Sequence, residues 1–177
     1  MTDSHPGQTP SVPMASADSR FTLRRLTRWD RSAHLAHLLR LSLSDRHARF
    51  QGGMSDAALE RYSNQIDWTS TVIFGLFEGT ELRGMSELFP FDIAQEGELS
   101  VSVESGCQHL GFGRRLVGAV LDTARSQGLR AVHMFFFRDN QGMHSLARAF
   151  GAKSRLSGGV LEGIVTFAET ERRKRAA

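Results

Sequence analysis

The chain has little cysteine and no long apolar run, and each shortage excludes a class of protein. A single cysteine, Cys107, excludes an internal disulfide and suits a reducing, cytoplasmic compartment. No apolar run approaches the roughly 20 residues that a membrane-spanning helix needs, so we expect no membrane partner. No cysteine-rich metal motif is present, so we expect no metal.

Proline is also scarce, and its distribution divides the chain. Three of the four prolines lie in residues 1–19, among Ser, Gly and Thr, which predicts a disordered tail. That tail lacks the basic and apolar regions of a secretory signal. A second tail, basic, is expected at residues 171–177. With 40% hydrophobic residues, we expect 20–170 to form one globular domain with a sizeable core.

The net charge of +3 comes mainly from arginine and raises the question of a nucleic-acid partner. However, the densest basic run, "ERRKRAA", is the C-terminal tail, and such runs are more often solvated. A phosphate-rich small ligand would suit the same charge. We therefore expect no nucleic acid.

Hydrophobic periodicity predicts an α/β (α+β) domain. The expected sheet is mixed and mostly antiparallel, with about seven strands and four flanking helices. Ser55 and Asn140 are expected to begin helices, Gly128 and Gly151 to end them, and Gly79 to turn a hairpin. The helices are expected at Asp30 to about Leu43, after Ser55, after Gly113 and after Asn140. One strand–helix–strand crossover, Leu99 to Phe137, should join parallel strands.

The stretch "VESGCQHLGFGRRLVGAV" passes from an alternating strand to an amphipathic helix through a glycine turn. A helix N-terminus presents unpaired N–H groups and partial positive charge, which favour an anion. Gly111 and Gly113 have no Cβ to obstruct a phosphate, and Arg114 and Arg115 add positive charge. The residues therefore favour a diphosphate site, with a simple tight turn as the alternative. Leu116 departs from the dinucleotide fingerprint, and no G-K-[ST] follows to make a P-loop.

The longer pattern from Gln108 to Gly113, "QHLGFG", resembles the Q/R-x-x-G-x-G/A signature of the GNAT superfamily of acyl-CoA-dependent N-acyltransferases. "NQGMHSLARAFGA" resembles a second element of that family, and the likeness covers roughly residues 21–167. "LSLSDRHARF" is similar to a segment in the GNAT domains of bacterial protein-lysine acetyltransferases.

The resemblance implies that the chain uses acetyl-CoA as co-substrate, without a metal, and acetylates a primary amine. That amine would belong to a small molecule or to a protein lysine, and a homodimer would be usual for the family. The diphosphate would bind the backbone amides from Gln108 through His109, Leu110, Gly111, Phe112 and Gly113 to Arg114. The pantetheine arm would bind the backbone of Val101 and Val103, and contact Asn140.

An amine attacks a thioester only in its neutral form, so a base must accept its proton. The resemblance places Glu98 in the position of a general-base glutamate, and Glu87 on the neighbouring strand is a second candidate. Without the resemblance, Glu98 would be an ordinary solvated carboxylate at the end of a strand. Glu87 would face either a cleft or solvent. Many family members carry a tyrosine acid after the leucine that corresponds to Leu146, but Ala147 stands here. Water or another group would then protonate the thiolate, unless catalysis is impaired.

Other reactive side chains have simpler interpretations. Cys107 is expected to be a bystander despite its place near a helix N-terminus, and His133 to be packed in the core or a cleft wall. The pair His34 and His37 is expected to be exposed on a helix rather than to bind metal. We expect Met134–Phe137 to lie in the core, and the arginines near the first helices, Arg46, Arg49 and Arg61, to be solvated.

Two functions stay open on the sequence alone. The leading one is an acetyl-CoA-dependent N-acetyltransferase that works by direct attack in a ternary complex. The alternative is a non-catalytic acyl-CoA-binding or sensing module with the same fold.

Overall fold

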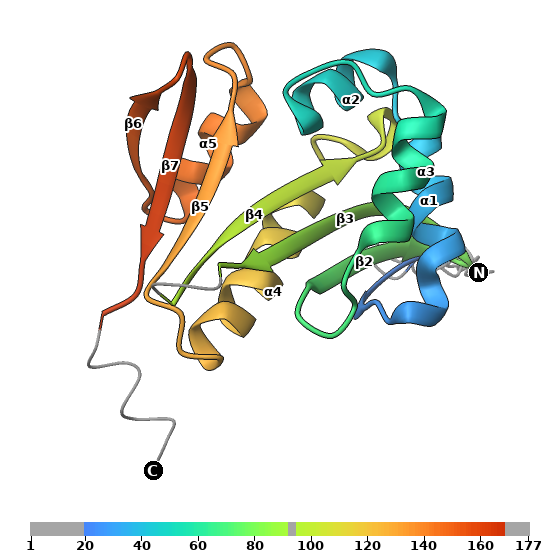
Figure 1. Cartoon of the computed structure of the whole chain (residues 1–177), viewed down its shortest axis with the longest axis horizontal. Helices are drawn as coiled ribbons and strands as arrows, with labels where there is room; N and C mark the ends of the chain where they lie inside the picture. The colour runs from blue at the N-terminus through green and yellow to red at the C-terminus, as the bar shows by residue number, and fades with distance from the viewer. Residues whose placement is uncertain (1–19, 92–94, 169–177) are drawn as a thin grey trace, which may run out of the picture.

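The computed structural model describes residues 20–91 and 95–168, and both expected tails lie outside these residues (Figure 1). The described chain forms a seven-stranded sheet in the order β1-β2-β3-β4-β5-β7-β6. Every neighbouring pair is antiparallel except β4 and β5, which confirms the expected mixed, mostly antiparallel sheet. The strands are β1 (Phe21–Arg25), β2 (Val72–Glu78), β3 (Glu81–Pro90), β4 (Glu96–Val103), β5 (Ala131–Phe136), β6 (Lys153–Ser157) and β7 (Val160–Thr166).

The two faces of the sheet carry different helices. On one face α4 packs on β2, β3 and β4, and α5 packs on β6 and β7. On the other face α1 and α2 contact β3 and β4, and α3 packs on α1 (Figure 1). The helices are α1 (Arg31–Arg40), α2 (Leu43–Phe50), α3 (Asp56–Gln65), α4 (Phe112–Ser126) and α5 (Gln141–Ala149). No helix in the described residues is long and apolar enough to span a bilayer.

Residues 20–91 and 95–168 contain one α-helix more than the four expected. The expected first helix, Asp30 to about Leu43, ends at Arg40, and α2 follows it as a helix that the sequence analysis does not predict. Leu41 has extended backbone (φ −60°, ψ 138°) and ends α1. The Ser42 hydroxyl then accepts a hydrogen bond from the Asp45 amide at 3.1 Å and begins α2. The serine with an acidic residue three positions later is the sequence signal for this helix start.

The other local predictions are confirmed. Ser55 accepts a hydrogen bond from the Ala58 amide at the start of α3, and Asn140 accepts one from the Met143 amide at the start of α5. Gly79 turns the β2–β3 hairpin with φ +61°, a conformation that favours glycine. Gly128 and Gly151 follow α4 and α5, also with positive φ.

The sheet forks between its two parallel strands. β4 and β5 pair only where Glu96–Glu98 meets Ala131–His133, and beyond Glu98 they separate (Figure 1). β3, by contrast, accompanies β4 along its whole length. Within the part of the chain that the structure describes, the β4 edge that faces the fork therefore has no strand partner from Leu99 onward.

Candidate active site

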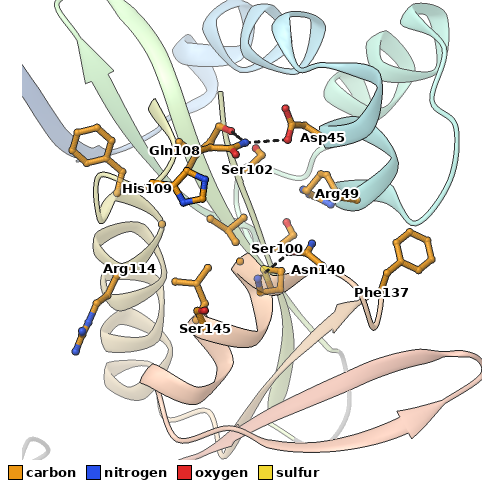
Figure 2. A pocket seen from close by; sticks show the side chains of 18 of the residues that line it. Asp45, Arg49, Ser100, Ser102, Gln108, His109, Arg114, Phe137, Asn140 and Ser145 are labelled. Atoms are coloured by element: carbon orange, nitrogen blue, oxygen red, sulfur yellow. Dashed lines mark hydrogen bonds between the residues drawn. The ribbon is translucent and has the colours of Figure 1, made fainter. Parts of the chain in front are cut away.

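A cavity of about 890 Å³ occupies the fork between β4 and β5 (Figure 2). Its walls come from α2, the open edge of β4, the glycine turn, the end of β5 and the start of α5. The lining includes Asp45, Arg49, Ser100, Val101, Val103, Gln108, His109, Gly111, Phe112, Gly113, Arg114, Phe135, Phe137 and Asn140. The structure thus brings together most of the residues from β4, the glycine turn and Asn140 that the resemblance assigns to acyl-CoA. Leu110, which is 57% exposed, and Glu98 are not part of this lining.

The glycine turn presents open backbone amides to this cavity. His109 and Gly111 have φ of +61° and +79°, so the chain turns sharply before α4 begins. The first turn of α4 starts with the bond from the Arg115 amide to the Gly111 carbonyl at 3.2 Å. The amides of residues 112–114 precede that bond and have no acceptor within the helix. An anion at this point would satisfy them and the helix dipole together.

The side chain of Gln108 links the glycine turn to α2 and β4. Its Nε2 donates to Asp45 Oδ1 and to the Val103 carbonyl, both at 3.0 Å (Figure 2). Ser105 Oγ also donates to Asp45, at 2.8 Å. Burial alone would raise the pKa of Asp45, but hydrogen bonds with Ser42, Ser105 and Gln108 lower it below its ordinary value. Asp45 therefore joins α2 to the glycine turn as a carboxylate, a contact that the sequence does not suggest.

Glu98 lies at the apex of the fork. Strand register places it between Phe89 of β3 and His133 of β5, on the sheet face that α2 approaches. Glu98 is half-buried and has no hydrogen-bond or ion-pair partner among residues 20–91 and 95–168. Burial raises the pKa of Glu98, against the opposing charges of Arg49 and His133. This carboxylate is therefore held in a partly desolvated place without being neutralised by a bonded partner.

The carboxylate of Glu87 faces neither solvent nor an open cleft, so the expectation that it faces one of the two is wrong. Its carboxylate is 1% exposed and forms an ion pair with Arg49. It also accepts hydrogen bonds from Tyr62 OH at 3.1 Å and Ser100 Oγ at 3.3 Å, and contacts His34 Nε2 at 3.0 Å. Burial alone would raise the pKa of Glu87, but the Arg49 charge and the His34 contact lower it to about 2. A carboxylate held by four partners is poorly suited to act as a base.

Two further polar expectations are wrong. His34 and His37 are fully buried rather than exposed, because each faces polar groups on the sheet. His37 contacts Ser102 Oγ at 2.9 Å and Glu104 at 3.2 Å. Arg46 and Arg49 are also largely buried rather than solvated, with side chains 11% and 8% exposed. His34, His37 and Arg49 connect the first three helices to β3 and β4.

We expect Glu87→Gln to destabilise the fold by about 3–5 kcal/mol, because it leaves the buried Arg49 charge uncompensated. The pKa of Glu87 is depressed from 4.5 to about 2, so its stabilisation is present above pH 4.5 and is lost as the pH falls towards 2. The difference between wild type and variant should therefore shrink from pH 6 to pH 3. Urea unfolding over that range measures it, with exposed Glu60→Gln as matched control. A change below about 1 kcal/mol at pH 6 would contradict this account.

The strand "AVHMFFF" is only half core. Met134 and Phe136 are fully buried against α4 and α5, but Phe135 and Phe137 point to the other face and line the cavity. Phe137 stacks on His47 of α2 with ring centroids 4.9 Å apart, so the two sides of the fork touch above the cavity. Cys107 also lines the cavity, and burial raises the pKa of its thiol, which does not favour a nucleophile.

Comparison with known proteins assigns the family. The model of the Acetyltransferase (GNAT) family matches residues 33–152, more than half of the chain, and the chain belongs to this family. Acetyltransferase PA5475 of Pseudomonas aeruginosa is 30% identical over 135 residues, which are 73% of each chain.

Solved structures share the fold. The GNAT domain of S. lividans PAT aligns with a TM-score of 0.71 at 18% identity, over 82% of this chain and 89% of that one. Spermidine N-acetyltransferase from Vibrio cholerae, solved with CoA and spermine, aligns with a TM-score of 0.66 at 20% identity. That alignment covers 88% of this chain and 99% of the Vibrio protein.

Proposed function

We propose that the protein is an acetyl-CoA-dependent N-acetyltransferase that transfers the acetyl group directly to a primary amine. The observation that carries the proposal is the glycine turn with open amides at the head of a forked sheet, in a chain of the GNAT family. The Vibrio cholerae protein and an N-acetyltransferase from Thermoplasma acidophilum, both solved with CoA, support a CoA-based co-substrate. A cytoplasmic location and a homodimer belong to the same proposal.

In this proposal the diphosphate of acetyl-CoA binds the amides from Gln108 to Arg114. The arm runs along the open edge of β4, where the backbone of Val101 and Val103 lines the cavity, and reaches Asn140. Glycine at positions 111 and 113 suits the diphosphate, because a Cβ at either position would obstruct the approach of the phosphates to the backbone amides. Because most of these contacts are to the backbone, the side chains of the turn matter mainly through their size and charge.

Bound acetyl-CoA supplies the thioester, whose carbonyl carbon forms a C–N bond with the amine while its C–S bond breaks. Glu98 accepts the proton that the ammonium must lose, directly or through a water molecule. Its pKa, raised by burial, moves it towards that task. The single tyrosine of the chain, Tyr62, donates to Glu87, and burial raises its pKa further. We therefore assign the protonation of the leaving thiolate to water.

Initial-velocity kinetics test this proposal. With a panel of primary amines and acetyl-CoA both varied, direct attack predicts intersecting double-reciprocal lines and one free thiol released per acetylated amine. Parallel lines with an acetylated protein would contradict direct attack. Tight acetyl-CoA binding without acetylation of any amine would instead favour the non-catalytic acyl-CoA-binding module.

A further inference from the structure

Ser102 of β4 is one of the side chains on the wall of the cavity, and it is joined to a histidine and a carboxylate (Figure 2). Its hydroxyl contacts His37 Nε2 at 2.9 Å, and the other ring nitrogen, Nδ1, contacts Glu104 Oε1 at 3.2 Å. Ser102 and Glu104 are two residues apart at the end of β4, so both side chains point to the side where α1 presents His37. A hydroxyl, an imidazole and a carboxylate joined in this order form the arrangement that activates a serine nucleophile.

The protonation state of His37 suits this role. A carboxylate only accepts hydrogen bonds, so the contact with Glu104 places the ring proton on Nδ1. His37 is fully buried, and burial lowers its pKa against the opposing effect of Glu104. The nearby charges of Arg40 and His34 lower that pKa further. At neutral pH the ring is therefore uncharged, and the lone pair of Nε2 faces the Ser102 hydroxyl.

Glu104 is held as a carboxylate beside the ring. Arg40 and Arg83 donate hydrogen bonds to it at 2.9 and 3.1 Å, and its side chain is 13% exposed. Burial alone would raise the pKa of Glu104, but hydrogen bonds from His37 and the two arginines lower it to about 2. Glu104 is therefore a positioning residue, which fixes the orientation and the tautomer of His37 without taking up its proton.

The backbone beside Ser102 offers donors for the carbonyl oxygen of an acyl group. The amide of Glu104 donates to the Arg83 carbonyl of β3, so the even-numbered residues at this end of β4 direct their backbone groups towards β3. The amides of Val101 and Val103 consequently face the fork, where β4 has no strand partner among the described residues. In α/β-hydrolases, the amide of the residue that follows the nucleophile belongs to the oxyanion hole, and Val103 holds that position here.

We propose that Ser102, His37 and Glu104 form a hydrolytic site, and that the protein hydrolyses acyl-CoA when no amine is bound. Ser102 Oγ attacks the thioester carbonyl carbon, so that a C–O bond forms and the C–S bond breaks. His37 Nε2 takes the hydroxyl proton and passes it to the CoA sulfur. A water molecule then attacks the serine ester, gives its proton to His37 and releases the carboxylic acid, while Ser102 Oγ recovers a proton from His37. This inference rests on the acyl-CoA binding of the proposed function and adds a second activity to the same cavity.

One position of the thioester serves both reactions. With its carbonyl oxygen at the Val101 amide, the thioester lies one residue from Ser102 and three from Glu98, about 3 Å and 10 Å along the strand. A bound amine and a water molecule span the longer distance, so a bound amine takes the acyl group directly. Without an amine, the hydroxyl activated by His37 is left to attack. Thiol release in excess of acetylated amine is therefore expected only at low amine concentration.

Release of free thiol from acetyl-CoA without any amine tests the inference. We expect wild type to hydrolyse acetyl-CoA and Ser102→Ala to lose this activity by about 10²-fold or more, because alanine has no nucleophile. Ser102→Ala should keep its Kd for acetyl-CoA and most of its amine acetylation. Glu98→Gln should show the reverse pattern, which excludes a water molecule activated by Glu98 as the source of hydrolysis.

The failure of this inference is distinguishable from the failure of the proposed function. Hydrolysis that survives in Ser102→Ala, or a wild type that acetylates amines without hydrolysing acetyl-CoA, would overturn the hydrolytic site while the acetyltransferase function stands. Absence of acetyl-CoA binding to wild type would overturn both.

Two further variants separate the site from general damage to the cavity. Ser145→Ala is the matched control, because Ser145 also lines the cavity, from α5, and this variant should hydrolyse acetyl-CoA as wild type does (Figure 2). An equal loss in Ser145→Ala and Ser102→Ala would overturn the assignment. Glu104→Gln removes a carboxylate that raises the pKa of His37, so the acidic limb of hydrolysis should move to lower pH. An unmoved limb would exclude Glu104 from the site.

Discussion

Glu98→Gln is expected to lower kcat by about 10²- to 10⁴-fold, the usual contribution of general-base catalysis. Glutamine keeps the size and polarity of the side chain but cannot accept the proton of the ammonium. Because Glu98 has no bonded partner among the described residues, its loss leaves no buried charge uncompensated. The Kd for acetyl-CoA and the urea midpoint should therefore stay close to wild type. Steady-state kinetics with a saturating amine measure the effect.

The pH dependence distinguishes a base from a structural residue. Burial raises the pKa of Glu98 above 4.5, and only its deprotonated form accepts a proton. The wild-type rate should therefore fall on acidification through that raised pKa, and the Glu98→Gln variant should lose this acidic limb. Glu60→Gln, at an exposed position on α3, serves as the control. A Glu98→Gln variant with wild-type kcat would remove Glu98 from the mechanism.

Features that depend on neighbours in the sequence are predicted well. The glycine turn, the caps at Ser55 and Asn140 and the β2–β3 hairpin each follow from a few adjacent residues and their backbone preferences. The parallel pairing of β4 with β5 follows from the length of the helical crossover between them. These features place the cavity, because the fork opens beside the turn that begins α4.

The polar network around Glu87 could not be predicted in the same way. Its members, among them His34, Arg49 and Glu87, come from three separate elements, and no local pattern states that they meet. A charged residue on a helix is usually solvated, so the sequence alone predicts exposed side chains for His34 and Arg49. Burial became favourable only because each group found partners of complementary charge or hydrogen bonding.

The side of β5 that lines the cavity is a second feature that the sequence does not predict. The run from Val132 to Phe137, apolar except for His133, indicates a strand buried on both faces. The fork instead removes β4 from one side of β5, so Phe135 and Phe137 line a cavity while Phe136 remains in the core. Hydrophobic periodicity does not indicate where two paired strands separate.

The second large effect is expected from Gly111→Glu combined with Gly113→Glu. The two carboxylates would stand where the diphosphate is proposed to bind, adding repulsion and obstructing the open amides. Loss of several charge-assisted hydrogen bonds, each worth roughly 1.5–3 kcal/mol, should weaken acetyl-CoA binding by more than about 100-fold. Position 111 has φ +79°, so Gly111→Asn, which tolerates that conformation, separates backbone strain from charge.

Gly52→Glu combined with Gly53→Glu is the matched control. Neither glycine has positive φ, and neither position brings a new Cβ closer than 4.0 Å to another group. This control adds the same two charges in the loop between α2 and α3, outside the lining of the cavity. It should bind acetyl-CoA as wild type does, and circular dichroism should show that all variants are folded.

Calorimetric titration of acetyl-CoA into wild type and the Gly111→Glu, Gly113→Glu variant tests the central claim most directly. We predict micromolar binding by wild type and by the Gly52→Glu, Gly53→Glu control, and no measurable binding by the folded turn variant. Absence of binding to wild type, or equal binding by the turn variant, would contradict the assignment of the glycine turn as the acyl-CoA site.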